Sequence, residues 1–184
     1  EVAGNEIYAI RDGLFSTPAL VRIDKDGYEH TLRRFSRSAS GLDLSPDGGR
    51  LLWSETVTDP RWSRKSKSVI RSYDLDTRRT RTVSRRGQLY NPISDESGTL
   101  AAEYTYEGGT GISRINPDGS IDSIFKASDG QQVIEAASDD SEVYVAILTD
   151  EGMGICRVAD GGLVCVLEPQ PVTISEMQFC NGLL

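Results

Sequence analysis

The sequence predicts an all-β fold, a β-propeller of about four four-stranded blades that forms either a partial propeller or a small closed ring. Two features predict it: a segment that recurs along the chain and a series of regularly spaced hairpin turns. Periods of roughly 40 to 50 residues with four strands each are typical of propeller blades. The 18 glycines, against one histidine and two methionines, also indicate many turns and few long helices.

The recurring segment is a short strand, a turn that starts with serine and carries acidic residues, and a second strand rich in apolar residues. Its serines, Ser45, Ser94 and Ser138, lie 49 and 44 residues apart. A partial fourth copy follows at 177–184. A single blade cannot bury its own apolar faces, so these units are expected to stack side by side.

A second hairpin signal follows each copy and also precedes the first. Alternating strands flank turns at Asp24–Gly27, Asp74–Thr77, Asn116–Gly119 and Ala159–Gly162. Asp or Asn followed by Gly supplies the positive φ that tight hairpins require. Hairpins at regular spacing favour an all-β architecture.

The repeat makes the chain a single propeller region, residues 1–184. We expect a partial blade that lacks its innermost strand at 4–36. Three complete blades should follow at about 40–86, 88–127 and 131–170, and a terminal inner strand at 172–184. The terminal strand could pair with the first blade and close a four-bladed ring. A piece of a larger propeller is the favoured alternative, because four-bladed rings are uncommon and the apolar end at 182–184 is typical of an interrupted strand.

Charge and hydropathy exclude several classes of protein. The formal net charge is -8, and the basic residues cluster between Arg33 and Arg86. This cluster could bind a phosphate-rich partner, but a solvated face paired with nearby acids is favoured. No nucleic-acid-binding motif is present, so we expect no nucleic acid partner. No stretch reaches the roughly 18 apolar residues of a membrane span.

The three cysteines, Cys156, Cys165 and Cys180, do not have metal-site spacing, and we expect no metal or other cofactor. Cys156 and Cys165 flank the turn at 159–162. A turn centred on residues 160 and 161 would place them opposite one another and permit a disulfide. A glycine bulge would break that register, and two buried free thiols are the favoured alternative.

The segment Ser45-Pro46-Asp47-Gly48, followed by an apolar strand, resembles the S-P-D-G repeat of TolB-like and WD40-like propellers. The copies at Ser94 and Ser138 are degenerate, with acidic residues in place of proline. The segments at 60–62, 66–68 and 73–75, taken in this order, resemble a pattern in bacterial envelope proteins built on these repeats. The resemblance implies a periplasmic or cell-surface location, but it says little about function because such blades serve many roles.

Catalytic signals are few. The chain lacks a G-x-S-x-G nucleophile elbow. His30 alternates within an expected strand at 28–32 and is expected to face solvent. Asp24 and Asp26 lack the third acid and the distal glutamate of a calcium loop. These features favour a non-catalytic binding or scaffolding module that recognises a protein or peptide partner; the alternative is the accessory propeller of a serine peptidase or other hydrolase whose catalytic domain lies elsewhere.

A long polar segment is the strongest candidate for binding. We interpret Thr56–Ser68 as a loop much longer than a minimal hairpin connection, and long loops on rigid scaffolds often carry function. The segment combines a tryptophan, which could act as a planar anchor, with arginine and lysine side chains. The corresponding segment of the next blade adds tyrosines. The candidate binding residues are Arg61, Trp62, Arg64, Lys65, Tyr104 and Tyr106. Packing of Trp62 against the neighbouring blade is an equal alternative.

The innermost strands are expected to line an axial channel. The polar residues that they would present to it are Asp43, Asn91, Glu135 and Glu176. A water-filled polar channel is normal for a propeller, so a ligand-binding role for these residues is the less favoured interpretation.

Overall fold

The computed structural model describes residues 1–35, 38–45, 47–59, 61–84, 88–95, 98–104, 109–139, 142–160, 162–175 and 177–178, with backbone alone at 59, 62–65 and 104. These residues form sixteen strands in four sheets. In the described ranges, no helix is long and apolar enough to cross a membrane.

Each sheet contains four consecutive antiparallel strands in sequence order. The first two sheets contain β1 (Val2–Ala3), β2 (Glu6–Arg11), β3 (Ala19–Ile23) and β4 (Glu29–Arg34), then β5 (Ala39–Leu44), β6 (Arg50–Asp59), β7 (Trp62–Asp74) and β8 (Arg79–Ser84). The last two contain β9 (Leu89–Asp95), β10 (Gly98–Tyr104), β11 (Thr110–Ile115) and β12 (Ile121–Lys126), then β13 (Gln132–Asp139), β14 (Glu142–Thr149), β15 (Gly152–Ala159) and β16 (Gly162–Gln170).

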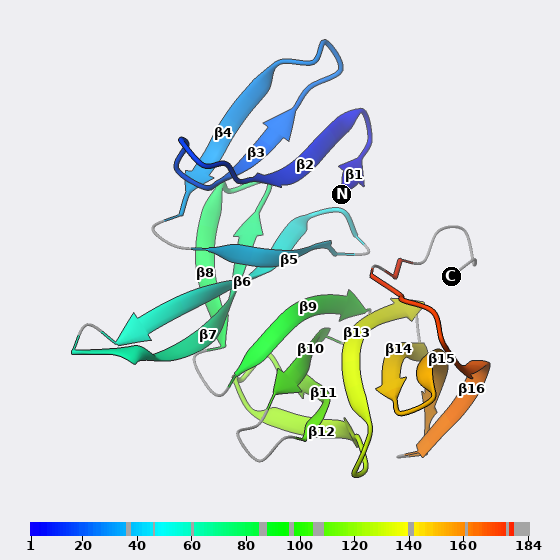
Figure 1. The fold of residues 1–184 in the computed structure, drawn as a ribbon. Coiled ribbons are helices and arrows are strands. Elements are labelled where there is room, and N and C mark those ends of the chain that lie inside the picture. The colour runs from blue at the N-terminus through cyan, green and yellow to red at the C-terminus, as the bar shows by residue number, and fades with distance from the viewer. Residues whose placement is uncertain are drawn as a thin grey trace.

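The sheets are arranged as consecutive blades along an arc (Figure 1). The first strands of the second, third and fourth sheets converge, because β9 packs against both β5 and β13. The all-β propeller prediction is confirmed. The described strands do not close into a ring, and an open side separates the first blade from the fourth (Figure 1).

Most of the described hydrophobic core lies between neighbouring blades. The first and second blades enclose Leu20, Leu51 and Trp53, whose indole ring lies 5.7 Å from the Phe35 ring. The third and fourth blades share a further cluster that includes Val145. Each blade therefore buries its apolar faces against a neighbour, as the repeat predicts.

Short polar contacts set the turns. In the S-P-D-G segment, the Ser45 hydroxyl donates to Asp47 and accepts a hydrogen bond from the Arg50 backbone N–H at 2.9 Å. Gly48 adopts a positive φ of 67°. The last turn of the first blade uses Asp24, whose Oδ1 accepts the backbone N–H groups of Asp26 and Tyr28. These carboxylates therefore cap turns, which is the usual role of Asp in hairpins.

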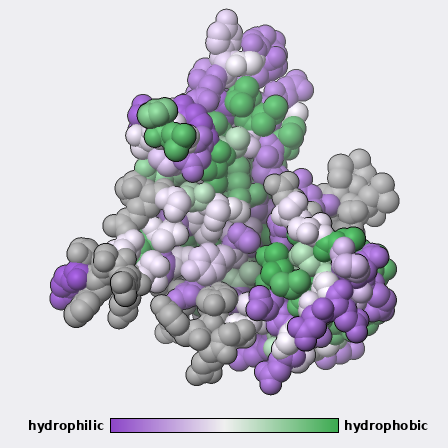
Figure 2. All heavy atoms as spheres, viewed as in Figure 1, coloured by the Kyte–Doolittle hydropathy of each residue, from purple (hydrophilic) through white to green (hydrophobic). Residues whose placement is uncertain are grey.

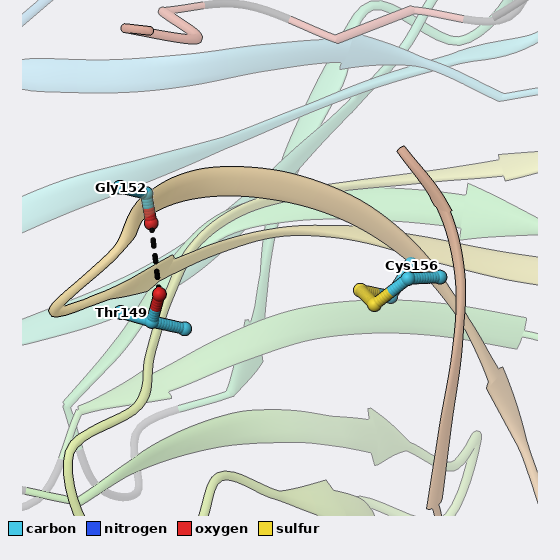
Figure 3. Close-up of a disulfide and its surroundings, with 4 residues drawn as sticks. Thr149, Gly152 and Cys156 are labelled. Atoms are coloured by element: carbon cyan, nitrogen blue, oxygen red, sulfur yellow. Dashed lines mark hydrogen bonds between the residues drawn. A yellow bond between two sulfur atoms is a disulfide. The ribbon is translucent and has the colours of Figure 1, made fainter. Parts of the chain in front are cut away.

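Cys156 and Cys165 form a disulfide between β15 and β16, so the favoured prediction of free thiols was wrong (Figure 3). The two residues are directly paired in the ladder. The turn keeps this register because Ala159 pairs with Gly162, and the nearest irregularity falls on the far side of the cysteine, between Ile155 and Cys156. A two-residue turn with Asp160 at a φ of 48° thus brings the cysteines together.

The N-terminal end of the propeller region differs from the prediction, and residues 176 and 179–184 of the terminal strand predicted at 172–184 lie outside the described residues. The first sheet has four strands, because β1 at Val2–Ala3 pairs with β2. The described part of 172–178 forms no strand. It packs instead against the fourth blade, where Met177 joins a cluster with Met153. The next residue contacts the start of the chain, because the Gln178 amide donates to Glu1 Oε1 at 3.0 Å. These apolar side chains therefore cover a blade face rather than extend a ladder.

Candidate functional site

The segment interpreted as a long loop is instead a long β-hairpin. β6 has ten residues and β7 has thirteen, and their pairing runs from Arg50–Asp74 to Asp59–Trp62. The β-branched residues Thr56, Val57 and Thr58 continue the ladder outward from the blade. The hairpin projects away from the arc of blades (Figure 1), and the part of its tip that is not drawn in grey is hydrophilic (Figure 2).

The root of the hairpin is anchored by a carboxylate whose side chain is only 12% exposed. Glu55 accepts a hydrogen bond from the Trp53 indole N–H at 3.0 Å and from Arg71 Nε at 3.2 Å. Arg33 of the first blade lies 3.5 Å from the same carboxylate. Because Glu55 receives charged groups from two blades, the base of the hairpin is fixed to the scaffold.

The candidate binding residues fall largely on this hairpin. Arg61 is exposed between β6 and β7. Trp62, Arg64 and Lys65 lie in β7, where the backbone is described. Tyr104 ends β10, whereas Tyr106 lies outside the described residues.

A cleft of about 590 Å³ opens between the third and fourth blades. It lies at the same edge of the sheets as the β6–β7 hairpin, because links from second to third strands and links between blades share that edge. Its wall includes carboxylates and one ammonium group, from Glu103, Lys126, Asp129 and Asp150. Sequence reasoning missed this cleft, because its residues come from four separate segments.

Two hydrogen bonds of Thr110 hold the floor of this cleft, the first between the two blades and the second beside the β11–β12 pair of the third blade. The Thr110 hydroxyl accepts the Val133 backbone N–H at 2.6 Å, and the Thr110 carbonyl accepts Ala127 N–H at 2.9 Å. Gly111 allows β12 to approach closely, since an added Cβ would lie 2.3 Å from the Phe125 carbonyl oxygen. The cleft is therefore preformed, and it offers polar groups suited to amide or ammonium ligands.

A second cleft of about 630 Å³ lies where the inner strands converge. Asp43, Asn91 and Glu135 all line it, together with Glu1 and Tyr8. Glu176 lies outside the described residues. Its lining side chains include the carboxyl groups of Glu1, Asp43 and Glu135 but no Lys or Arg among the described residues.

Asp43 links the inner strands of this axial cleft. Its Oδ2 accepts the Ser94 hydroxyl at 2.6 Å, and the Ser138 hydroxyl donates to the Ser94 carbonyl at 2.9 Å. The serines of the two degenerate repeats thus connect three consecutive blades. Burial raises the pKa of Asp43 to about 7, although the hydrogen bond from Ser94 opposes this shift.

The positive φ of Asn91, 48°, accompanies close contact between β9 and β5. A Cβ added to Gly41 would lie 2.7 Å from the Asn91 Cα. Tyr8 borders the same cleft, and burial, with the bond from its hydroxyl to Glu6, raises its pKa to about 12. The Tyr8 phenol therefore stays protonated. The wall of the axial cleft is held here by this hydrogen bond and by the close contact of β9 with β5.

His30 is half-exposed, with 46% of its side chain accessible. Its Nε2 lies 2.9 Å from Asp24 Oδ2, in a turn of the first blade. The described hydrogen bonds of His30 include no serine hydroxyl or cysteine thiol. The His30–Asp24 pair therefore belongs to a surface turn of the first blade.

Solved structures share this architecture. TolB from Acinetobacter baumannii superposes with a TM-score of 0.67 at 14% identity, covering 90% of this chain and 41% of TolB. The fold is that of a TolB-like β-propeller. A putative TolB from Agrobacterium tumefaciens gives a TM-score of 0.67 at 13% identity over 91% of this chain and 64% of its own.

The β-propeller domain of the Trilobed protease from Pyrococcus furiosus, which has an open velcro topology, also matches this TolB-like propeller. The TM-score is 0.59 at 12% identity, over 91% of this chain and 56% of that one. The chain thus spans less than two thirds of each of these structures. No family model and no curated protein matches the sequence.

Proposed function

We propose that this TolB-like propeller is a non-catalytic binding or scaffolding module that recognises a protein or peptide partner through one edge of its blades. The observation that carries the proposal is the basic β6–β7 hairpin, which projects beyond the blades from a root fixed by Glu55. A rigid scaffold that presents an exposed element is a common arrangement for recognition.

The surroundings of the hairpin support a peptide rather than a small molecule. The polar cleft between the third and fourth blades opens at the same edge. A partner that contacts both would extend across several blades. Arg61 and Trp62 would supply cationic and aromatic anchors, which are enriched at energetic hot spots.

Selection from a random peptide library tests the proposal directly. The unaltered propeller should enrich binding peptides, and a variant with Arg61→Ala and Trp62→Ala should lose that enrichment. A matched control, Lys25→Ala with Arg79→Ala, removes one exposed cation from each of two turns far from the hairpin tip and should keep it. Failure to enrich any peptide, or equal enrichment by the hairpin variant, would contradict the proposal.

A second candidate function is the accessory propeller of a serine peptidase or other hydrolase. The match to the Trilobed protease propeller supports it. The coding sequence around this segment separates the two functions. A G-x-S-x-G motif with downstream Asp and His would support the hydrolase, whereas further S-P-D-G repeats would support the binding module.

We further propose a location in the periplasm or at the bacterial cell surface. The S-P-D-G repeat and the similarity to TolB structures support this location. The disulfide between Cys156 and Cys165 is also more typical of an oxidising compartment. Fractionation of the native host, followed by thiol labelling before and after reduction, tests location and cysteine state together.

A further inference from the structure

Among the described residues, the outer edge of β7 is unpaired near the tip of the β6–β7 hairpin. β8 first pairs with β7 at Ile70, opposite Ser84. Between Trp62 and Lys67, no described strand pairs with that side of β7; Ser66 and Lys67 are exposed there, whereas Ser68 and Val69 are buried. An edge of this kind presents backbone N–H and C=O groups that can accept another strand.

Three backbone hydrogen bonds around the hairpin determine which residues of β7 point their N–H and C=O groups away from β6. Ser45 N–H donates to Arg50 C=O, and Thr56 N–H donates to Ser38 C=O, so the even-numbered residues of β6 face β5. Leu75 N–H donates to Gly49 C=O, so the odd-numbered residues of both strands face one another.

In β7, Lys67 is therefore bonded to β6, whereas Ser66 and Ser68 point their backbone groups outward. This follows because the register from Thr58–Ser66 to Arg50–Asp74 is unbroken. An incoming strand would pair with Ser66 through hydrogen bonds, because Ser66 is exposed whereas Ser68 is buried, with 1% of its surface exposed. Lys67, and Lys65 beyond Ser66, would sit at positions where cross-strand side chains come closest.

We infer that this edge binds an extended acidic peptide by strand addition, an inference that rests on the proposed binding function. Residues 61–67 include four cations, Arg61, Arg64, Lys65 and Lys67, and no acid. Acidic side chains two residues apart would face Lys65 and Lys67 from a paired strand. Opposite charges at such positions stabilise a ladder, and like charges destabilise it.

The same charges disfavour a second copy of this chain as the occupant. Antiparallel pairing of two β7 edges centred on Ser66 would place Lys65 of one copy opposite Lys67 of the other. Lysine on an edge strand is a common protection against nonspecific pairing. Here it would also select for acidic strands, because specificity needs repulsion of wrong partners as well as attraction of the right one.

Binding of four synthetic peptides, measured by fluorescence anisotropy, tests the inference. The first alternates glutamate with valine and threonine over eight residues; the second has the same side chains but N-methyl groups on alternate residues. The third replaces glutamate with lysine, and the fourth with glutamine. We expect the first to bind at least about tenfold more tightly than each of the others, with affinity falling as salt rises.

Two protein variants separate strand addition from simple charge attraction. Ser66→Pro removes an outward N–H without removing a bond to β6, and should weaken binding of the acidic peptide about tenfold, whereas Ser66→Ala should not. Lys65→Glu with Lys67→Glu should shift preference to the lysine peptide. Circular dichroism and thermal melting check that each variant folds.

Several outcomes would overturn the inference. One is equal binding of the methylated and unmethylated acidic peptides, which indicates charge attraction alone. Others are no binding of the acidic peptide, unchanged binding by Ser66→Pro, or a dimer in sedimentation that Lys65→Glu with Lys67→Glu abolishes. If library selection yields peptides without acids whose binding still needs Arg61 and Trp62, the proposed function stands and the strand-addition inference fails.

Discussion

The second and fourth blades carry hairpins at the same topological position, but these hairpins are built differently. In the second blade, β6 and β7 extend ten and thirteen residues and continue beyond their neighbours β5 and β8. In the fourth, β14 and β15 have eight residues each, and β15 is paired with β16 from Met153 to Ala159.

The ends of the two hairpins differ as well. In the fourth blade, the Thr149 hydroxyl donates to the Gly152 carbonyl at 3.2 Å, and the disulfide at Cys156 links β15 to β16 (Figure 3). The fourth-blade hairpin thus satisfies its backbone within its own sheet. The second-blade hairpin leaves an edge unpaired in the described residues, and this difference supports the proposal that the second-blade hairpin recognises a partner.

The largest expected effect is at the root of the second-blade hairpin. Trp53→Ala removes a side chain that is 0% exposed and that packs on Phe35. The cavity and the loss of a donor to Glu55 should lower the free energy of unfolding by about 3–5 kcal/mol. Urea unfolding measures this change; a loss below about 1 kcal/mol would show that the hairpin root is not part of the core.

The fourth-blade hairpin should depend on its cross-link. Replacing Cys156 and Cys165 with alanine opens a loop with a sequence separation of nine residues, which should cost roughly 2–3 kcal/mol. Thermal unfolding with and without a reducing agent measures the effect. Reductant should lower the melting temperature of the unaltered protein and leave the variant unchanged, and an insensitive unaltered protein would contradict the role assigned to the disulfide.

The axial cleft, which the inner strands of both blades help to line, should give the protein a pH-dependent stability. The pKa of Asp43 is raised from 3.8 to about 7, so the folded state holds a proton that the unfolded chain loses first. The stabilisation is therefore complete below about pH 4 and is lost as pH rises toward 7. Asp43→Asn should remove this dependence and be more stable than the unaltered protein by roughly 1–3 kcal/mol at pH 8.

Urea unfolding of both proteins from pH 4 to pH 8 provides the comparison. Glu135→Gln serves as a control, because it changes another cleft carboxylate outside the Ser94 hydrogen bond. Parallel pH profiles for the unaltered protein and Asp43→Asn would contradict the assignment.

The smallest expected effect is at the outer part of β7. Lys65→Ala with Lys67→Ala should change the free energy of unfolding by no more than about 0.5 kcal/mol, because surface substitutions away from the core rarely do more. The same pair of substitutions should weaken capture of the acidic peptide. A loss of stability above about 2 kcal/mol would instead make these residues part of the scaffold.

The repeat predicted the blades because its strands alternate and its turns use Asp, Asn and Gly at fixed positions. The β6–β7 hairpin escaped prediction because its outer residues are polar and lack apolar alternation. Its strands form there because the ladder from Glu55–Val69 continues through Thr56, Val57 and Thr58. Burial patterning cannot reveal a strand that buries neither face.

Contacts between blades were beyond the reach of the sequence. The three repeat serines look equivalent, yet Ser45 caps its own turn while Ser94 and Ser138 bond to the preceding blade. The cleft around Thr110 joins residues whose proximity depends on the packing of two sheets. The disulfide depended on the position of one bulge, which composition does not specify.

Residue-resolved amide hydrogen exchange in the free protein tests the central claim most directly, namely that the outer edge of β7 is open. Ser66 N–H should exchange at least about tenfold faster than Lys67 N–H, because the first points outward and the second is bonded to β6. Equal protection of both amides would contradict the account, since it would mean that another strand already occupies this edge.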